Sequence, residues 1–407
     1  MAMYISISLC LFLFIISLIC SKYNIFSPSV ITSGIWLSVL FLYTFLGSGL
    51  NPLTDKFLSA IDIWVTLFCV SSLFIQALSL SNNNRIKPSQ LARNIFFYAS
   101  LVTFPLLILH AYEIVKLGTS TNWMADMRSA AVGGIKGISI EDSNPFYTLI
   151  WLGSYLIELN CYSKENKKRV FVLFLMYLMY AFITMSKTNI LTLFLSTIFV
   201  LYSNKFIKFN HIAISGIIIL FVFLGVQSLR SNSTASKNPT SEFVTIYALS
   251  SAPAFETVKS ESSVQFGENV FRFFYAVKYK LGLTKMKPND TILGFVNVGV
   301  VTNTYTVLYP YYKDFGLSGI AFFSILLGLL LGFVYNKAEN GNVIFVVLYS
   351  FFLFELVMQL VGDLFFTNFS LNLKLILVAT TPYFISRYEL FSYSRKQLKI
   401  IKNKVDE

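Results

Sequence analysis

The chain has 407 residues, of which 55% are hydrophobic and 13% are charged. Soluble globular proteins carry about 25% charged residues, so this composition excludes an ordinary soluble domain and indicates an integral membrane protein. The formal net charge of +12 does not require nucleic acid as a partner, because cytoplasmic loops collect Lys and Arg and anionic lipid head groups attract them.

The apolar runs are long and continuous and lack the alternation of a transmembrane strand, so they predict helices. Because a span needs about 20 residues, we expect an all-α, polytopic membrane protein with about eleven transmembrane helices, plus or minus one, in a single membrane domain over residues 1–407. In chain order the runs are Met3–Ser21, Ser29–Gly49, Ile61–Leu80, Ile95–Lys116, Pro145–Ser163, Val170–Met185, Asn189–Tyr202, Ile212–Leu229, Gly316–Tyr335, Val343–Val361 and Leu373–Ser386.

Basic residues predict which loops face the cytoplasm. Lys and Arg gather between the third and fourth runs, between the fifth and sixth, after the seventh, and in the tail 387–407. With these segments inside, the N-terminus is outside, together with loops 117–144 and 230–314. We therefore expect the large loop 230–314 to lie on the outer face.

The stretch Val170–Tyr202 would be roughly 50 Å long as one helix, which exceeds a hydrocarbon core of about 30 Å. Both of its flanks are basic and belong on the same side, so we predict a turn at Thr184–Asn189. Two interpretations of Lys187 in this turn stay open. It lies in an interrupted span that lines a cavity and contacts substrate, or it reaches the interface from a tight hairpin.

Arginine is scarce in this chain, with eight Arg among 32 basic residues, and three of them lie in the predicted external loops: Arg128, Arg230 and Arg272. A planar guanidinium can donate two parallel hydrogen bonds to phosphate oxygens. We predict that these arginines bind pyrophosphate; the alternative is surface charge without a ligand. Small residues and glycines follow Arg128 and would let backbone N–H groups approach an anion, although the nucleotide P-loop motif is missing.

Around Arg272, apolar residues recur at helical spacing beside basic residues such as Lys278. This pattern predicts a short amphipathic helix that lies on lipid head groups. The helix either takes part in substrate binding or only rests on the membrane.

His110 and Glu113 are three residues apart in the fourth run, so they share a helix face. An ionisable pair within a span indicates a functional site, or else a polar pair that stabilises the bundle. His211, the other histidine, lies far away in sequence, and the four cysteines all fall in or beside apolar runs. We therefore expect neither a metal site nor a disulfide framework.

The end of the large loop contains Thr302-Asn303-Thr-Tyr305 and Tyr311-Tyr-Lys-Asp314-Phe-Gly316-Leu-Ser-Gly319. With Phe26-Ser-Pro28-Ser, Ser186-Lys-Thr-Asn189 and the segment Gly328–Tyr335, it resembles the bacterial O-antigen polymerases of the Wzy type, the oligosaccharide repeat unit polymerases. The likeness covers the whole length as a topology, while the motifs that carry it are short.

The resemblance implies a multi-helix, GT-C-like membrane glycosyltransferase in the bacterial inner membrane. It would act from the periplasmic side and transfer a growing glycan from undecaprenyl pyrophosphate to a new lipid-linked repeat unit. It implies no nucleotide sugar, no cofactor and no metal, and it suggests a membrane protein that regulates chain length as a partner. Some members carry Arg, ten residues and Gly in two external loops. Arg128, Arg230 and Arg272 lack Gly at that spacing, so their roles rest on chemistry.

The chemistry of this reaction matches residue types in the loops. A departing pyrophosphate gains negative charge that fixed cations stabilise, and an acceptor hydroxyl needs a base. Catalytic candidates are Arg128, Arg230 and Arg272 as cations and Glu256, Asp314, Glu113 and His110 as bases. Substrate-binding candidates are Lys187, Lys278, Asn303, Tyr305, Tyr309, Tyr311, Tyr312 and Lys313.

Two other functions stay open at this stage. An O-antigen ligase would use the same donor and a lipid A core acceptor. A flippase for lipid-linked oligosaccharides would only move the substrate across the bilayer. The missing internal repeat and the long external loop disfavour the flippase.

Overall fold

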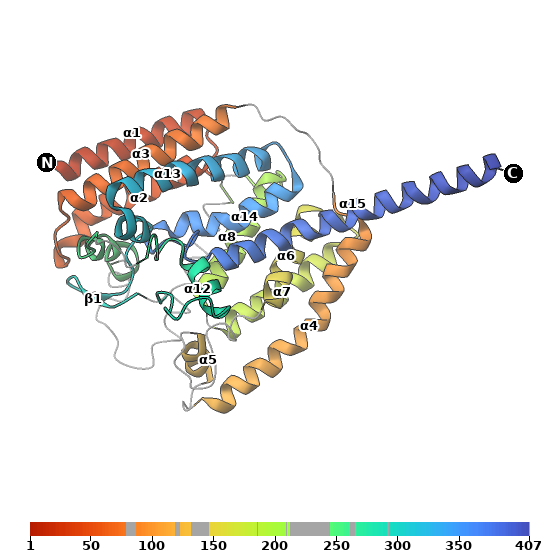
Figure 1. Cartoon of the computed structure of the whole chain (residues 1–407). Coiled ribbons are helices and arrows are strands. Elements are labelled where there is room, and N and C mark those ends of the chain that lie inside the picture. The colour runs from red at the N-terminus through yellow and green to blue at the C-terminus, as the bar shows by residue number, and fades with distance from the viewer. Residues whose placement is uncertain are drawn as a thin grey trace. The chain divides into compact units, whose positions relative to one another are not determined.

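The structure is a computed structural model that describes residues 1–78, 87–118, 123–131, 146–184, 186–208, 210–211, 245–260, 265–290 and 293–406. Helices dominate these residues (Figure 1), and seven of them are long and apolar enough to span a membrane. The chain is therefore an all-α, polytopic membrane protein, as its composition predicts.

The long apolar helices coincide with predicted runs. They are α1 (Ala2–Cys20), α2 (Pro28–Leu46), α3 (Asp55–Ala77), α4 (Gln90–Leu117), α13 (Tyr309–Glu339), α14 (Val343–Val357) and α15 (Phe369–Asp406). Three further runs form the shorter helices α6 (Tyr147–Asn160), α7 (Lys167–Ile183) and α8 (Lys187–Ser203). The predicted run Ile212–Leu229 lies outside the described residues.

The predicted turn between α7 and α8 is confirmed. α7 ends at Ile183 and α8 begins at Lys187, and each has 17 residues, or about 25 Å, which is short for a full crossing. The hydroxyl of Ser186 accepts a hydrogen bond from the backbone N–H of Asn189 (3.2 Å) and so caps α8. Lys187 is buried, and its contact with substrate stays a prediction.

The two loops that are predicted to be external contain short elements of their own. Loop 117–144 contains α5 (Trp123–Ala131). Loop 230–314 contains a π-helical turn (Thr245–Leu249), α11 (Ser251–Glu256) and α12 (Arg272–Lys280), followed by the paired strands β1 (Val296–Asn297) and β2 (Val301–Thr302). The helix that was predicted around Arg272 is therefore present.

The chain forms two compact units. The first contains residues 1–81, 233–337 and 352–373, and the second contains residues 82–232, 338–351 and 374–407. In the first unit, α1, α2 and α3 pack against one another (Figure 1). α13 packs closely on α3, because a Cβ atom added at Gly328 would lie 2.6 Å from the carbonyl oxygen of Phe68. Small residues allow this close approach of helix backbones.

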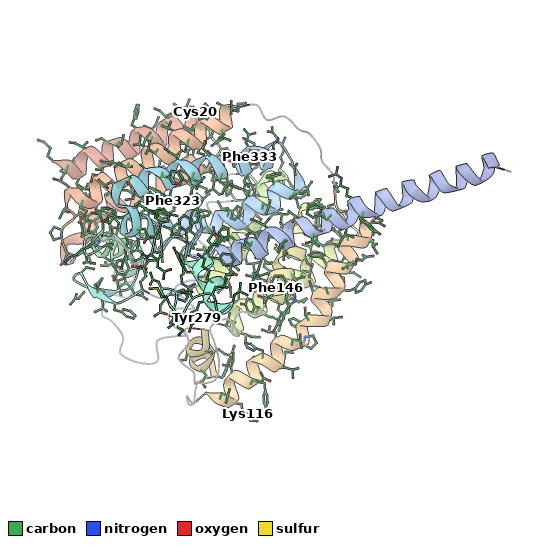
Figure 2. All side chains as sticks on the ribbon, viewed as in Figure 1. Cys20, Lys116, Phe146, Tyr279, Phe323 and Phe333 are labelled. Atoms are coloured by element: carbon green, nitrogen blue, oxygen red, sulfur yellow. The ribbon has the colours of Figure 1, made fainter. Side chains whose placement is uncertain are left out.

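Tyr311 lies at the centre of the first unit and is fully buried. Its ring stacks on Trp64 (centroids 5.6 Å apart) and on Phe323 (4.7 Å), which Figure 2 labels. Gly316 follows with φ 64°, a conformation that glycine adopts without steric cost. It separates the first turns of α13 from the apolar helix. The aromatic core therefore fixes the chain where the large loop enters the membrane-spanning part.

In the second unit the central polar group is Glu158 on α6. Arg93 on α4 donates to it from Nε (3.1 Å) and from its terminal nitrogen, and Arg169 on α7 lies 3.8 Å away. Asn166 also donates to this carboxylate (2.7 Å). These contacts join three helices through one buried acid.

Candidate functional site

A cavity of about 270 Å³ lies within the first unit. Four segments line it: the start of α12, the loop before Leu293, the segment that enters α13, and the loop after α14. The lining residues are Asn269, Arg272, Asn289, Asp290, Leu293, Asn303, Thr304, Thr306, Tyr309, Pro310, Val361, Gly362, Asp363, Leu364, Thr367 and Asn368.

The lining of this cavity is rich in amide and hydroxyl groups. Four asparagines and three threonines line it, whereas Arg272 is the one basic residue among the described lining residues. Side-chain amides both donate and accept hydrogen bonds, and so do hydroxyl groups. This chemistry suits a ligand that is rich in hydroxyl groups, such as a sugar.

Arg272 is positioned by a chain of hydrogen bonds. Its Nε donates to the carbonyl oxygen of Asn289, and the amide of Asn289 donates to the Oδ1 of Asn269 (3.0 Å). Asn269 in turn donates to Asp314, from its backbone N–H (3.0 Å) and from its side chain (2.5 Å). The carboxylate of Asp314 therefore anchors the wall that carries Arg272.

Asp363 shapes the part of the lining that follows α14. It accepts hydrogen bonds from the hydroxyl of Tyr311 (2.8 Å), from the backbone N–H groups of Phe365 (3.1 Å), Phe366 (3.1 Å) and Thr367 (2.9 Å), and from the hydroxyl of Thr367 (3.1 Å). Burial raises the pKa of Asp363 above that of an ordinary aspartate, while these donors act in the opposite direction. The acid holds the loop after α14 in shape.

Glu256, a predicted base, takes part in a reciprocal cap. Its carboxylate accepts hydrogen bonds from the backbone N–H (2.6 Å) and hydroxyl (2.7 Å) of Thr54, at the start of α3. The ammonium group of Lys56 donates to the carbonyl oxygens of Phe255 (3.3 Å), Glu256 (2.9 Å) and Val258, at the end of α11. Opposite charges at helix ends complement the partial charges there, so this acid has a structural role.

A second cavity of about 370 Å³ shares Leu293 and Tyr309 with the first. Its other lining residues are Thr257, Val258, Lys259, Gly294, Val296, Tyr305 and Lys313. The hydroxyl of Tyr305 donates to the carbonyl oxygen of Gly294 (2.7 Å), and burial raises the pKa of Tyr305. The two cavities therefore adjoin at Tyr309.

Further predicted site residues of the first unit occupy several different surroundings. Arg272 and Asn303 line the first cavity, and Tyr305 and Lys313 line the second. Tyr311 lies in the aromatic core, and Tyr312 packs against Phe255 with Lys56 over its ring (5.0 Å). Lys278 is exposed on α12 near the ring of Tyr275 (5.6 Å). Exposed apolar side chains on α12, among them Tyr279 in Figure 2, fit a helix that contacts lipid.

The remaining predicted residues lie in the second unit or outside the described residues. His110 and Glu113 lie on α4, Arg128 on α5 and Lys187 on α8, all in the second unit. The side chain of Arg128 and all of Arg230 lie outside what the structure describes. The convergence of the three arginines on one pyrophosphate stays a prediction.

Sequence reasoning missed several residues of the first cavity: Asn269, Asn289, Asp290, Asp363, Thr367 and Asn368. A signal for the last three was present, because they lie in Gly362–Ser370, a segment between two predicted spans that has no Lys or Arg. Among the described residues, no group of three His, Cys, Asp or Glu could hold a metal ion. That the reaction needs no metal stays a prediction.

A family model described as putative O-antigen polymerase matches residues 2–360. The chain belongs to this O-antigen polymerase family. The match includes three of the four segments that line the first cavity, while the loop from Val361 to Asn368 follows it. No curated protein and no solved structure matches the chain significantly. Membership places the protein among membrane-bound, glycosyltransferase-like polymerising enzymes of lipopolysaccharide biosynthesis.

Proposed function

We propose that this O-antigen polymerase joins oligosaccharide repeat units that are carried on undecaprenyl pyrophosphate, and that the first cavity is where the glycan reacts. The observation that carries the proposal is the cavity of amide and hydroxyl side chains around Arg272. Family membership supports a lipid-linked oligosaccharide as the substrate.

The reaction exchanges one bond for another. A hydroxyl oxygen of the acceptor repeat unit forms a bond to the anomeric carbon of the donor glycan. The bond from that carbon to the phosphate oxygen breaks, and the pyrophosphate leaves on its lipid. The proton of the attacking hydroxyl passes to a base. A fixed guanidinium at Arg272 stabilises the charge that develops on the leaving oxygen.

Asp290 is the acid that we assign as the base. Its carboxylate lines the first cavity and is largely exposed, with an ion pair to Lys287 at 3.4 Å. Asp314, Asp363 and Glu256 instead accept several hydrogen bonds from neighbouring segments. The carboxylates of Asp314 and Asp363 hold the walls of the site and that of Glu256 caps α3, whereas that of Asp290 can take a proton from a bound hydroxyl.

A reconstituted assay tests the function. The purified protein in lipid nanodiscs receives a lipid-linked repeat unit and, as the alternative acceptor, lipid A core, and the products are separated by length. We expect a ladder of polymer on the lipid carrier, and we expect Asp290→Asn to reduce it while Glu165→Gln, an exposed acid outside the cavity, leaves it unchanged. Transfer only to lipid A core would indicate a ligase, and transbilayer movement without new bonds would indicate a flippase; either result would overturn the proposal.

We also propose that the cavity opens on the periplasmic side of the inner membrane, as the positive-inside rule predicts. Cysteine placed at Lys285 should react with a membrane-impermeant thiol reagent in cells whose outer membrane is permeabilised. Cysteine at Lys167 should react only after the inner membrane is opened. The reverse pattern would place the site on the cytoplasmic side.

A further inference from the structure

The two adjoining cavities differ in charge. The first is lined by Arg272 and by two acids, Asp290 and Asp363, whereas Lys259 and Lys313 are the charged residues among the described lining of the second. A group with several negative charges is repelled by carboxylates and attracted by ammonium groups. The second cavity therefore suits an anion better than the first does.

Lys313 lies at the junction between the cavities. Its ammonium nitrogen donates to the hydroxyl of Tyr309 (3.3 Å) and lies 5.6 Å from the centroid of that ring. The two residues are four apart on α13, which places them on one helix face. Because Tyr309 lines both cavities, the ammonium group of Lys313 lies next to the boundary between them. A substrate that occupies both cavities would cross this boundary.

The hydroxyl groups of the second cavity already donate within the protein, from Thr257 to the carbonyl oxygen of Ala254 (2.7 Å) and from Tyr305 to that of Gly294 (2.7 Å). The two ammonium groups beside them are the donors that suit phosphate oxygens, because they form strong, charge-assisted hydrogen bonds. A volume of about 370 Å³ leaves room for a diphosphate with bound water.

We propose that the second cavity is a phosphate site that takes the diphosphate of the lipid-linked substrate, while the first cavity holds the sugar. This assignment rests on the proposed function. The phosphate attached to the sugar then lies near Tyr309, within reach of the charge on Arg272, and the phosphate attached to the lipid lies with Lys259 and Lys313. Substrate binding would be divided between a nearly neutral pocket for hydroxyl groups and a basic pocket for the diphosphate.

A binding experiment without turnover tests the proposal. The full-length protein in phosphatidylcholine nanodiscs is titrated with inorganic pyrophosphate and with farnesyl diphosphate. We expect the double variant Lys259→Ala/Lys313→Ala to bind both probes on the order of a hundredfold more weakly, because each charge-assisted hydrogen bond corresponds to about a tenfold change. The affinity of Lys313→Arg for both probes should stay within a few-fold of the wild-type affinity, since this variant keeps the positive charge.

Matched controls are Lys280→Ala and Lys285→Ala, which remove exposed lysines that line neither cavity. Thermal unfolding checks that every variant is folded, and the single variants Lys259→Gln and Lys313→Gln replace the double variant if it is not. Equal binding by the wild type and the lysine variants would overturn the proposal, and so would an equal loss in the controls.

Two further measurements distinguish the two possible ligands of the second cavity, the phosphate of lipid head groups and the diphosphate of the substrate. If nanodiscs with phosphatidylglycerol abolish pyrophosphate binding, the cavity takes lipid head groups, and the assignment to the diphosphate is overturned. If lysine-dependent binding of farnesyl diphosphate persists in them, the assignment holds. Lysine-dependent binding by a protein that makes no polymer would refute the proposed function and leave the phosphate site standing.

Discussion

Acids that accept several hydrogen bonds play different roles in the two units. In the second unit, Glu158 is paired with arginine side chains that come from two other helices. In the first unit, Asp314 and Asp363 are held by backbone N–H groups and neutral side chains. Arg272 beside them donates to a backbone carbonyl oxygen on the wall of a cavity. The second unit uses its charges to join helices, whereas the first uses acids to shape loops that present a cation.

The largest expected effect breaks the charge network of the second unit. Glu158→Ala leaves Arg93 without its buried partner, and removing one partner of a buried ion pair costs about 3–5 kcal/mol. Urea unfolding of the detergent-solubilised protein should show that the free energy of unfolding falls by an amount at the lower end of this range, because Arg93 is partly exposed. Glu165→Ala, an exposed acid in the next loop, is the control, and equal stability of the two variants would contradict the prediction.

The next largest expected effect concerns Arg272, which lines the first cavity. Arg272→Lys keeps the charge but loses the planar pair of donors, and removing one donor to developing charge costs about 100-fold in rate. Polymer length on a gel should fall sharply at normal protein abundance in the membrane. Lys280→Ala, an exposed change on the same helix, should leave the ladder unchanged. A normal ladder from Arg272→Lys would remove this residue from the site.

A third comparison separates Asp363, a buried acid that shapes the cavity, from Asp290, an exposed acid that lines it. Asp363→Asn replaces one acceptor oxygen with an amide donor that faces N–H donors, and leaving such groups unsatisfied costs about 1–3 kcal/mol. Asp290→Asn should leave the free energy of unfolding unchanged, since its side chain is largely exposed. Equal destabilisation by both variants would show that the distinction between these acids is wrong.

The smallest expected effect concerns the reciprocal cap. Glu256→Gln weakens the hydrogen bonds to Thr54 at the start of α3, and loss of a helix cap typically costs about 1 kcal/mol. The thermal midpoint should fall by a few degrees at most, while the polymer ladder persists. Loss of polymer from a stable, abundant Glu256→Gln protein would restore Glu256 as the catalytic base.

Among the described residues, the sequence predicted the seven helices that are long and apolar enough to span a membrane, and the turn between α7 and α8. Burial in a bilayer depends on the apolar character of a continuous window of about 20 residues, so the signal is local. The scarcity of arginine also pointed to Arg272. That residue does line a polar cavity, although its catalytic role stays a prediction.

Which polar residues line one cavity depends on the tertiary structure. Glu256 and Asp314 have the chemistry of a base in the sequence, yet their oxygens are occupied by donors from other segments. The partners Glu256 and Thr54 are 202 residues apart, and Asp363 meets Tyr311 across 52 residues. A hydrogen bond depends on where the fold brings its donor and acceptor, and residue type alone does not contain that information.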